Sequence, residues 1–563
     1  MTKHRDQRSS SVLGSSAVMA AGTMVSRLSG YLRTILLAAA LGNMLHADVF
    51  NIANTIPNMV YILLAGGIFN AVLVPQLVRS MKNDPDGGEA YTNRIITLAA
   101  LFLGTVTVLL VIFAPVAMGL FLDSSFDDPA LAAQRDSIVD FARFCLPQVF
   151  FYGMFVLVGQ ILNSRGRFGP MMWAPIANNV ISVAILGIYL LVFGAARGAE
   201  QCGPFSTSQE MLLGIGSTLG IVAQFAILLP YLRAAGFRYR PRFDFRGTGL
   251  GHTLRLGVWT VLFVVVNQIA YTVVVRLASS GTASTVGECG QSVTSAGTGY
   301  TVYSNTYLMA MVPHAIITVS LATAVLPALS RRAADVDLRG LAATLSSTLR
   351  TALALIIPFA ALLPFLADPI ARIVWGYGAA ADSYQNFAPS LALFAPALFF
   401  FTIHYFMLRG FYALERTRTV FFIQCAVSAS NIALAVVLVG RTDASFTSPA
   451  LVIAFGGAYA VGATLSFFQL RHALGGLELK ALVSFLARTA LAALIASTAA
   501  WLTLELLTEP LTGAGWFGVA FLLGVTGLVD VVVFAIAASA FQVREVSELI
   551  EMISRRLPLP RRR

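Results

Sequence analysis

Fourteen apolar segments, each about as long as a bilayer crossing requires, limit this chain to one kind of fold. A transmembrane helix needs roughly 20 consecutive, mostly apolar residues. Only 12% of the 563 residues are charged and 57% are apolar, whereas soluble domains carry about 25% charged residues. The sequence therefore predicts an all-α polytopic membrane protein with about 14 transmembrane helices. The predicted spans are residues 13–41, 49–79, 93–122, 139–163, 169–194, 210–233, 252–278, 301–330, 341–366, 387–412, 418–440, 447–470, 482–507 and 513–541.

The basic residues predict the orientation of these spans. With both termini inside, most of the 38 Lys and Arg residues fall in cytoplasmic segments, as the positive-inside rule requires. Asp123, Asp127, Asp128 and Asp136 gather in a predicted outside loop. The net charge of +11 is then explained by loops that face anionic lipid headgroups, without a nucleic-acid partner. We expect a multi-pass membrane protein with both termini in the cytoplasm.

Two similar segments suggest an internal repeat. AVLVPQLVRS at 71–80 resembles TAVLPALSRR at 323–332. The parallel predicts two pseudo-symmetric six-helix lobes, an arrangement that in transporters places the site between the halves. The expected parts are a cytoplasmic tail (1–12), the first lobe (13–233), a basic cytoplasmic linker (234–250), the second lobe (251–472), helices 13 and 14 (473–541) and a basic cytoplasmic tail (542–563).

Arg27 and Arg33 lie inside the first apolar segment. An arginine at bilayer depth costs a few kcal/mol or more, so it normally faces a bundle interior, a water-filled cavity or a ligand. Six residues place the two side chains about 120° apart around a helix, so both can line one cavity. The planar guanidinium suits phosphate, which predicts an anionic, phosphate-bearing substrate. The alternative is a pair of structural cations bonded to backbone carbonyls.

Other polar residues are concentrated in the opening helices of each predicted lobe. Asn51, Asn54 and Asn58 share one helical face, and the seventh segment carries Asn267 and Gln268. We expect these side chains, with Asn58 binding substrate, to line the cavity. Helices 13 and 14 have almost no polar residues near their centres.

Two charged residues near the outer ends of spans allow several roles. Asp48 either caps the second helix or pairs with a substrate amine or a gate residue. Arg276 either reaches the interface or faces the cavity. We treat both as candidate substrate-binding residues.

The four cysteines indicate little chemistry. Cys145 and Cys425 lie in spans and suit packing. Cys202 and Cys289 lie in predicted outside loops, where they either form a disulfide or remain unpaired thiols. The sequence shows no catalytic signature, no phosphate loop and no metal-spaced His/Cys cluster, so we expect neither an enzyme nor a cofactor.

The segment SRLSGYLRTILLAAALG and the following ADVFNIANTIPNMVYILLAGGIFNAVLVPQL resemble the opening signature of a known family. That family is MurJ (MviN), the bacterial lipid II flippases of the multidrug/oligosaccharidyl-lipid/polysaccharide exporter superfamily. LATAVLPALS at 321–330 agrees with it. The matching positions are Ser26, Arg27, Gly30, Arg33, Asp48, Phe50, Pro57, Asn58, Gly67, Phe69, Val74 and Pro75.

The resemblance implies two lobes around a central cationic cavity, with helices 13 and 14 forming a groove for the lipid tail. Arg27 and Arg33 would bind the diphosphate, and Asp48 would be a further functional residue. The chain departs from the family at Tyr61 and around Tyr307, where many relatives carry basic residues. Arg276 is then a candidate for the positive charge of the second lobe.

We therefore expect a flippase that moves lipid II to the outer leaflet by alternating access. The rival substrates are another polyprenyl-diphosphate-linked glycan or, for a drug antiporter, a cation, although the latter calls for an acidic cavity. A membrane glycosyltransferase would need larger outside loops bearing carboxylates, and a non-transporting scaffold would not need the buried arginines. The coupling ion and any partners in division or cell-wall synthesis stay open.

Overall fold

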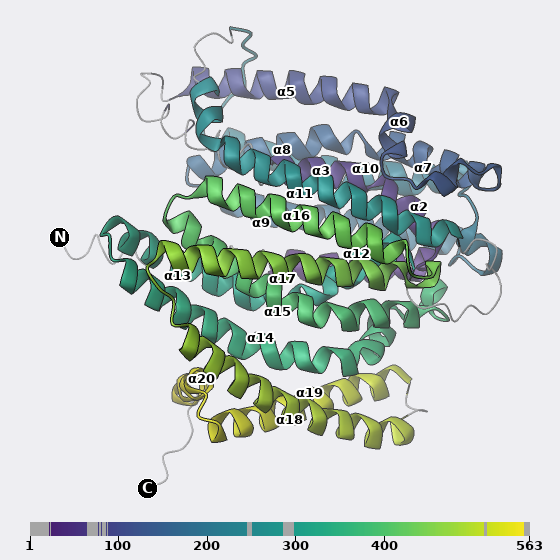
Figure 1. The fold of residues 1–563 in the computed structure, drawn as a ribbon. Helices are drawn as coiled ribbons and strands as arrows, with labels where there is room; N and C mark the ends of the chain where they lie inside the picture. The colour runs from purple at the N-terminus through teal and green to yellow at the C-terminus, as the bar shows by residue number, and fades with distance from the viewer. Residues whose placement is uncertain are drawn as a thin grey trace. The chain divides into compact units, whose positions relative to one another are not determined.

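The computed structural model describes residues 22, 24–64, 77, 80, 86, 88–244, 250–284, 298–511 and 515–556. The secondary structure of this part is entirely helical (Figure 1). Thirteen of its helices are long and apolar enough to cross a membrane, and each overlaps one predicted span. The remaining span, 49–79, lies partly outside the described residues; its described part contains α2 (Leu45–Ala53) and α3 (Thr55–Ile62). The prediction of an all-α polytopic membrane fold is confirmed.

The chain divides into two compact units. Unit 1 comprises residues 1–293, 299–301 and 377–381, and unit 2 comprises residues 294–298, 302–376 and 382–563. The seventh predicted span therefore groups by its contacts with unit 1. The predicted lobes at 13–233 and 251–472 follow the topology rather than these contacts, and they stay a prediction.

Unit 1 is built from helices that pack around α8. Buried side chains of α5, α8, α9 and α10 form a continuous hydrophobic core, and Val60 and Tyr61 of α3 pack against it. α10 begins with a capping box, in which Ser206 and Gln209 satisfy each other's backbone N–H groups. The helices are the first helix (Met24–Leu41), α2, α3, α5 (Glu89–Ile112), α6 (Ala114–Gly119), α7 (Ala132–Cys145), α8 (Gln148–Ser164), α9 (Gly169–Val192), α10 (Thr207–Ala234) and α11 (Leu250–Ser284).

The loop after α10 lies along α5. The side chain of Asn93 accepts a hydrogen bond of 2.7 Å from the backbone N–H of Arg240, and Thr97 accepts one of 3.1 Å from that of Arg242. Arg94 forms an ion pair with Asp244. This hydrogen bond from Arg94 lowers the pKa of the Asp244 carboxyl. The beginning of the predicted basic linker is therefore held against unit 1.

The helix α12 (Gly299–Ala310) begins in unit 1, and its residues from Val302 onward belong to unit 2. The eighth predicted span is not one straight helix, because α12 ends before Pro313 and a π-helical turn, η6 (His314–Thr318), precedes α13 (Val319–Ala334). Proline lacks the N–H that a continuous helix would use. The other helices are α14 (Leu338–Trp375), α15 (Ala388–Ala413), α16 (Thr417–Val439), α17 (Thr447–Ala473), α18 (Leu479–Leu511), α19 (Gly515–Ala540) and α20 (Arg544–Arg556).

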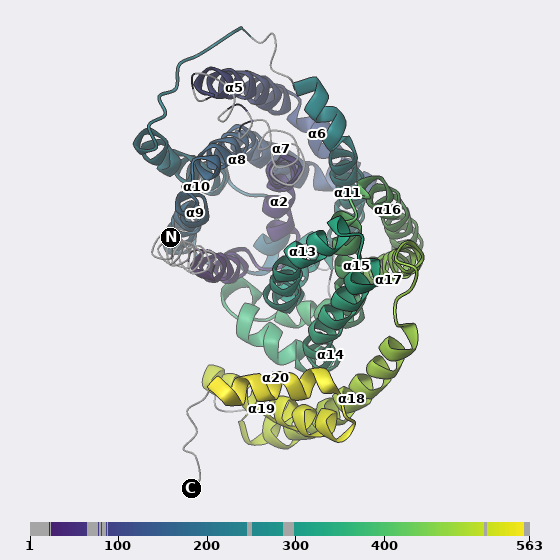
Figure 2. The same cartoon turned by 90° about the vertical axis from the view of Figure 1, so that its left-hand side faces the viewer.

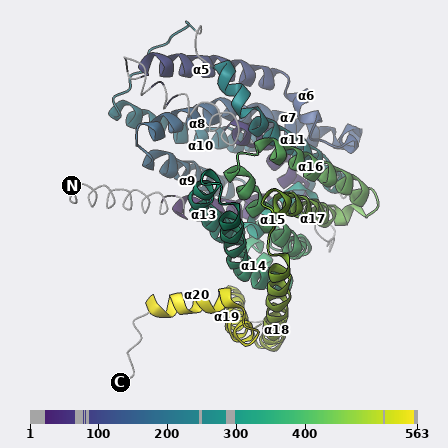
Figure 3. The ribbon, with the colours of Figure 1, turned by 60° about the vertical axis from the view of Figure 1, so that its left-hand side comes forward.

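The last three helices form a distinct group within unit 2. α18 and α19 lie side by side, and α20 follows α19 (Figures 2 and 3). Glu545 at the start of α20 forms an ion pair of 2.8 Å with Arg350 of α14. Short 3₁₀ helices occupy loops of the chain: η2 (Ser124–Asp127), η3 (Pro129–Leu131), η4 (Gly198–Cys202), η7 (Gly378–Ala380), η8 (Tyr384–Phe387) and η9 (Ala444–Phe446).

Candidate functional site

Arg27 and Arg33 both lie on the first helix. The Arg27 side chain is exposed and that of Arg33 is half-buried. Among the ion pairs of the described residues, none involves either arginine. Their positive charge is therefore not neutralised by a carboxylate of the described part, which leaves both guanidinium groups suited to an anion.

Asn179 of α9 fixes the orientation of the first helix. Its side-chain amide donates hydrogen bonds of 2.9 Å to the carbonyl of Ser26 and of 2.9 Å to the hydroxyl of Ser29. Because Asn179 is buried, it holds the first helix at a defined rotation about its axis. Ser26, which precedes Arg27 in the sequence motif, therefore helps to anchor the helix that carries the arginine.

Arg33 lies near one tyrosine of a packed pair. Tyr61 of α3 and Tyr152 of α8 have ring centroids 4.9 Å apart, and Arg33 is close enough to Tyr152 for its charge to act on the phenol. Tyr61 stands at the position where the family resemblance leads us to expect a basic residue. The second such position, Tyr307, instead packs against Phe394 and Phe455 in unit 2, with centroid distances of 5.9 Å and 5.6 Å.

The three asparagines of the second span have different environments. Asn54 lies at the junction of α2 and α3, where it donates to the carbonyl of Phe50 and accepts from Gln148 at 3.3 Å. Asn51 donates to the hydroxyl of Thr301 at 2.9 Å. The Asn58 side chain is exposed and donates to the carbonyl of Asn54 at 2.8 Å. Asn58 is therefore the one of the three that presents its side chain most openly.

On α11, the two predicted cavity residues are at least partly covered. The side-chain amide of Gln268 donates a hydrogen bond of 3.2 Å to the carbonyl of Met59. Asn267 is half-buried. Gln268 thus links α11 to α3.

Asp48 is completely buried and accepts hydrogen bonds from three residues. Its Oδ2 atom accepts from the Thr282 hydroxyl at 2.9 Å and from the backbone N–H of Tyr300 at 2.9 Å, and its Oδ1 atom accepts from the N–H of Thr301 at 2.7 Å. The first N–H groups of a helix have no partner within that helix, and a carboxylate beside them is stabilised. Asp48 therefore caps α12 rather than its own helix.

Gly299 makes this approach sterically feasible. Its φ angle is +89°, and a Cβ atom at this position would lie 2.6 Å from Oδ2 of Asp48 and 2.4 Å from Cγ2 of Thr282. Neither Gly299 nor the two threonines stood out in the sequence, because they lie more than 230 residues from Asp48 in the chain. We call Asp48, Thr282, Tyr300 and Thr301 the Asp48 clasp.

Arg276 lies at the outer end of α11. Its side chain is exposed, and its Nη1 atom donates a hydrogen bond of 3.3 Å to the carbonyl of Gly119, the last residue of α6. A cation at a helix C-terminus is favoured by the helix dipole. In the described structure, Arg276 thus joins α11 to α6.

The remaining candidates concern cysteines and cavities. Cys202 is disulfide-bonded and Cys145 and Cys425 are free, while Cys289 lies outside the described residues.

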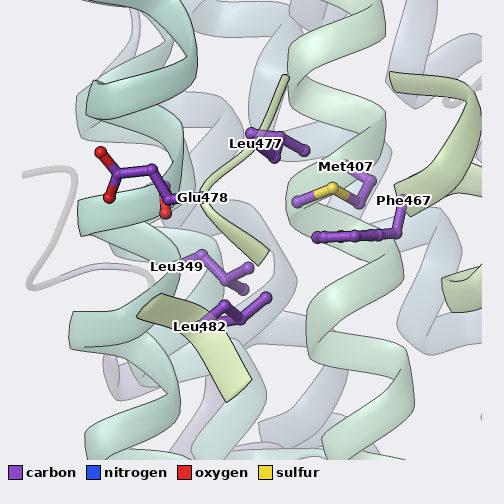
Figure 4. A pocket seen from close by; sticks show the side chains of 7 residues that line it. Leu349, Met407, Phe467, Leu477, Glu478 and Leu482 are labelled. Carbon is purple, nitrogen blue, oxygen red and sulfur yellow. The ribbon is translucent and has the colours of Figure 1, made fainter. Parts of the chain in front are cut away.

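A cavity of about 10 Å³ in unit 2 holds at most one water (Figure 4). A pocket of about 380 Å³ beside α7 is lined by Asp127, Asp128, Asp136 and Asp140 with Arg135 and Arg143. Its carboxylates make it a poor site for a diphosphate. Among the described residues, no three or more His, Cys, Asp or Glu side chains, those of this pocket included, lie close enough together to hold a metal ion.

The family described as "Lipid II flippase MurJ" matches residues 37–521 of this chain. The chain belongs to the MurJ family. A "Probable lipid II flippase MurJ" from Vibrio cholerae is 27% identical over 436 residues, which cover 75% of this chain and 77% of that protein. The match to the family begins after Arg27 and Arg33, so the roles of these two residues in a MurJ protein rest on the motif and on their environment.

Solved structures support the same fold. A structure titled "Lipid II flippase MurJ, inward closed conformation" has a TM-score of 0.69 at 18% identity and covers 93% of this chain and 98% of that chain. A structure titled "Inward-facing conformation of a multidrug resistance MATE family transporter of the MOP superfamily" has a TM-score of 0.61 at 15% identity, with 82% of this chain and 98% of that chain covered. The MurJ fold of this chain is thus similar to that of transporters in the wider superfamily.

Proposed function

We propose that this MurJ family member moves lipid II from the cytoplasmic to the outer leaflet of a bacterial plasma membrane. The observation that carries the proposal is the pair Arg27 and Arg33, which lies on a membrane-spanning helix with no carboxylate partner among the described residues. Two guanidinium groups can offer paired donors to a diphosphate. Asn58, exposed on α3, is a further candidate for headgroup contact.

The two arginines would act in sequence along the helix. With the N-terminus in the cytoplasm, Arg27 lies about 9 Å closer to the cytoplasmic end than Arg33, since each residue rises about 1.5 Å. An incoming headgroup would meet Arg27 first and then Arg33. The undecaprenyl chain would remain in the bilayer, and the proposed groove of α18 and α19 would hold it.

The Asp48 clasp would keep the outer end closed while the headgroup enters. It ties the start of α2 to the end of α11 and the start of α12. All four residues of the clasp belong to unit 1, and α12 continues from Thr301 into unit 2, so a movement of α12 in an alternating-access cycle would strain these hydrogen bonds. Release of the headgroup outside would then require Asp48 to exchange them for water.

Such a cycle forms and breaks no covalent bond, so the protein would act as a transporter and not as an enzyme. A membrane potential of about 100 mV is worth about 2.3 kcal/mol for each charge moved. This energy is sufficient to bias the return of an empty, positively charged site. Both termini would lie in the cytoplasm.

The test is complementation of a bacterium whose own MurJ can be depleted. We expect the wild type to restore growth and R27A and R33A to fail, while R441A, which removes an exposed loop arginine, should restore it. R27K and R33K separate charge from the paired donors of arginine. Expression and thermal unfolding of each variant exclude loss of folding.

Flipping of labelled lipid II in proteoliposomes identifies the substrate. Wild-type transport that R27A and R33A abolish would support the proposal. Growth with all three proteins would show that the arginines are structural. A well-expressed wild type that neither complements nor moves lipid II would point to another polyprenyl-diphosphate-linked glycan.

A further inference from the structure

A carboxylic acid lies near the middle of α19, one of the two helices for which we expected almost no polar residues near the centre. Asp530 is fifteen residues from the start of the helix at Gly515 and ten from its end at Ala540. Only 3% of its surface is exposed. An ionisable residue at this depth is costly and generally functional. The Asp48 clasp and the first helix do not use it.

Two hydroxyl-bearing residues accompany Asp530 in the interior of the helix pair. Ser497 of α18 faces the carboxyl group, and Thr526 lies one turn away on α19. Both residues are buried. Within the described residues, Oδ1 of Asp530 and the hydroxyl groups of Ser497 and Thr526 lack hydrogen-bond partners of good geometry. Buried polar atoms are normally paired, so this group of three requires an explanation.

Among the described residues, no cation lies close enough to stabilise a carboxylate at this position. α19 packs against α18, α14 and α20. On α18, the nearest charged residues to Ser497 are Arg488 and Glu505, which are about 14 Å and 12 Å away along the helix axis. On α20, charged residues begin at Arg544, fourteen residues beyond Asp530 and therefore about 20 Å along the chain if it were helical throughout.

The cationic residues of α14 are also distant from Asp530. Leu362 and Leu366 of α14 pack in one cluster with Ala500 of α18, three residues beyond Ser497. Asp368 is the nearest charged residue beyond Leu366, and two residues place it about 3 Å further along the helix axis. It is acidic and opposes ionisation of Asp530. Arg350, twelve residues before Leu362, and Arg372, six residues after Leu366, are further away.

We propose that Asp530 is a proton-binding site that links the packing of α18 and α19 to protonation. In the closed pair, the neutral acid donates a hydrogen bond to Ser497, whereas a carboxylate would be an isolated charge in an apolar environment. Release of the proton requires water to reach the pair, so α18 and α19 loosen when Asp530 ionises. This inference concerns the helix pair alone and does not depend on the role of Arg27 and Arg33.

Labelling with dicyclohexylcarbodiimide tests the site, because this apolar reagent converts a protonated carboxyl group in a membrane into a stable N-acylurea. The full-length protein in proteoliposomes is labelled between about pH 5 and about pH 8, and the modified residue is located by mass spectrometry. We expect an adduct on Asp530 that decreases as the pH rises and is lost in D530N. E505Q, which removes a carboxyl group elsewhere on α18, should leave the adduct unchanged.

Three outcomes would overturn the inference. One is the absence of an adduct on Asp530 over the whole range, and another is an adduct that does not depend on pH. Protection of Asp530 by added NaCl, with KCl as control, would identify a sodium site instead. A second measurement uses thermal unfolding: the melting temperature of wild type should change with pH more than that of D530N, and equal pH dependence would contradict the proposal.

Discussion

The carboxylate of Asp48 accepts a hydrogen bond of 2.7 Å from the backbone N–H of Thr301, 253 residues later in the chain. This bond and its neighbours satisfy the first turn of α12 with a side chain from α2. A charge-assisted hydrogen bond is about twice as strong as a neutral one, and the site is fully buried. The ends of α2, α11 and α12 are therefore held together by one carboxylate.

Replacing this carboxylate should weaken the fold. D48N keeps the shape of the side chain, but its NH₂ group cannot accept, so at least one backbone N–H of α12 loses its partner. Leaving a buried donor unpaired costs about 1–3 kcal/mol. We expect a lower melting temperature for D48N than for D136N, which changes an exposed aspartate of α7. Equal melting of the two variants would mean that Asp48 does not hold the clasp.

The same clasp should be sensitive to a single methyl group. G299A introduces a Cβ at a positive φ angle and places it within 2.6 Å of Asp48. G475A is the matched control, because Gly475 also has a positive φ angle of +72° but has open space around its Cβ position. The backbone strain alone costs about 1–2 kcal/mol. We expect G299A to lower the free energy of unfolding clearly more than G475A does. A similar loss in both variants would mean that backbone strain alone explains the effect and that the added Cβ does not disturb the clasp.

Arg276 provides a test of a sequence-based hypothesis. Because its side chain joins α11 to the end of α6, we expect R276A to retain lipid II flipping and to lose only the helix-dipole contribution, about 0.3–1 kcal/mol of stability. Flipping by R276A is compared with that of R33A at equal expression. Loss of transport in well-folded R276A would instead place this residue in the substrate site.

The ion pair between Arg94 and Asp244 should respond to acid and salt. The pKa of Asp244 is lowered in the folded protein, so its contribution is present above the unfolded pKa of about 3.9 and is lost as the pH falls through the lower folded value. A spin label at R238C should be more mobile in D244N than in wild type at neutral pH. The difference should disappear in strong acid and shrink in high salt. A label that is equally mobile in both proteins at neutral pH would contradict the prediction.

The environment of the arginines could be predicted only in part. Arg27 and Arg33 stood out because charge within an apolar segment is unusual at any position of a membrane protein. Their contacts did not stand out: Asn179 lies 150 residues from Ser29, which it contacts, and Tyr152 belongs to a different helix. No periodicity within one segment reports which face of another helix it meets.

The sequence alone determined the helical fold class and the positions of the thirteen membrane-spanning helices found among the described residues. Those properties depend on local length and apolarity, because a bilayer demands about 20 apolar residues wherever they occur. Only the tertiary structure decided that Asp48 caps α12, that Arg276 meets Gly119 and that Asp530 is enclosed by α18 and α19. Each of these contacts joins residues from different helices, and helix packing brings them together regardless of their distance along the chain.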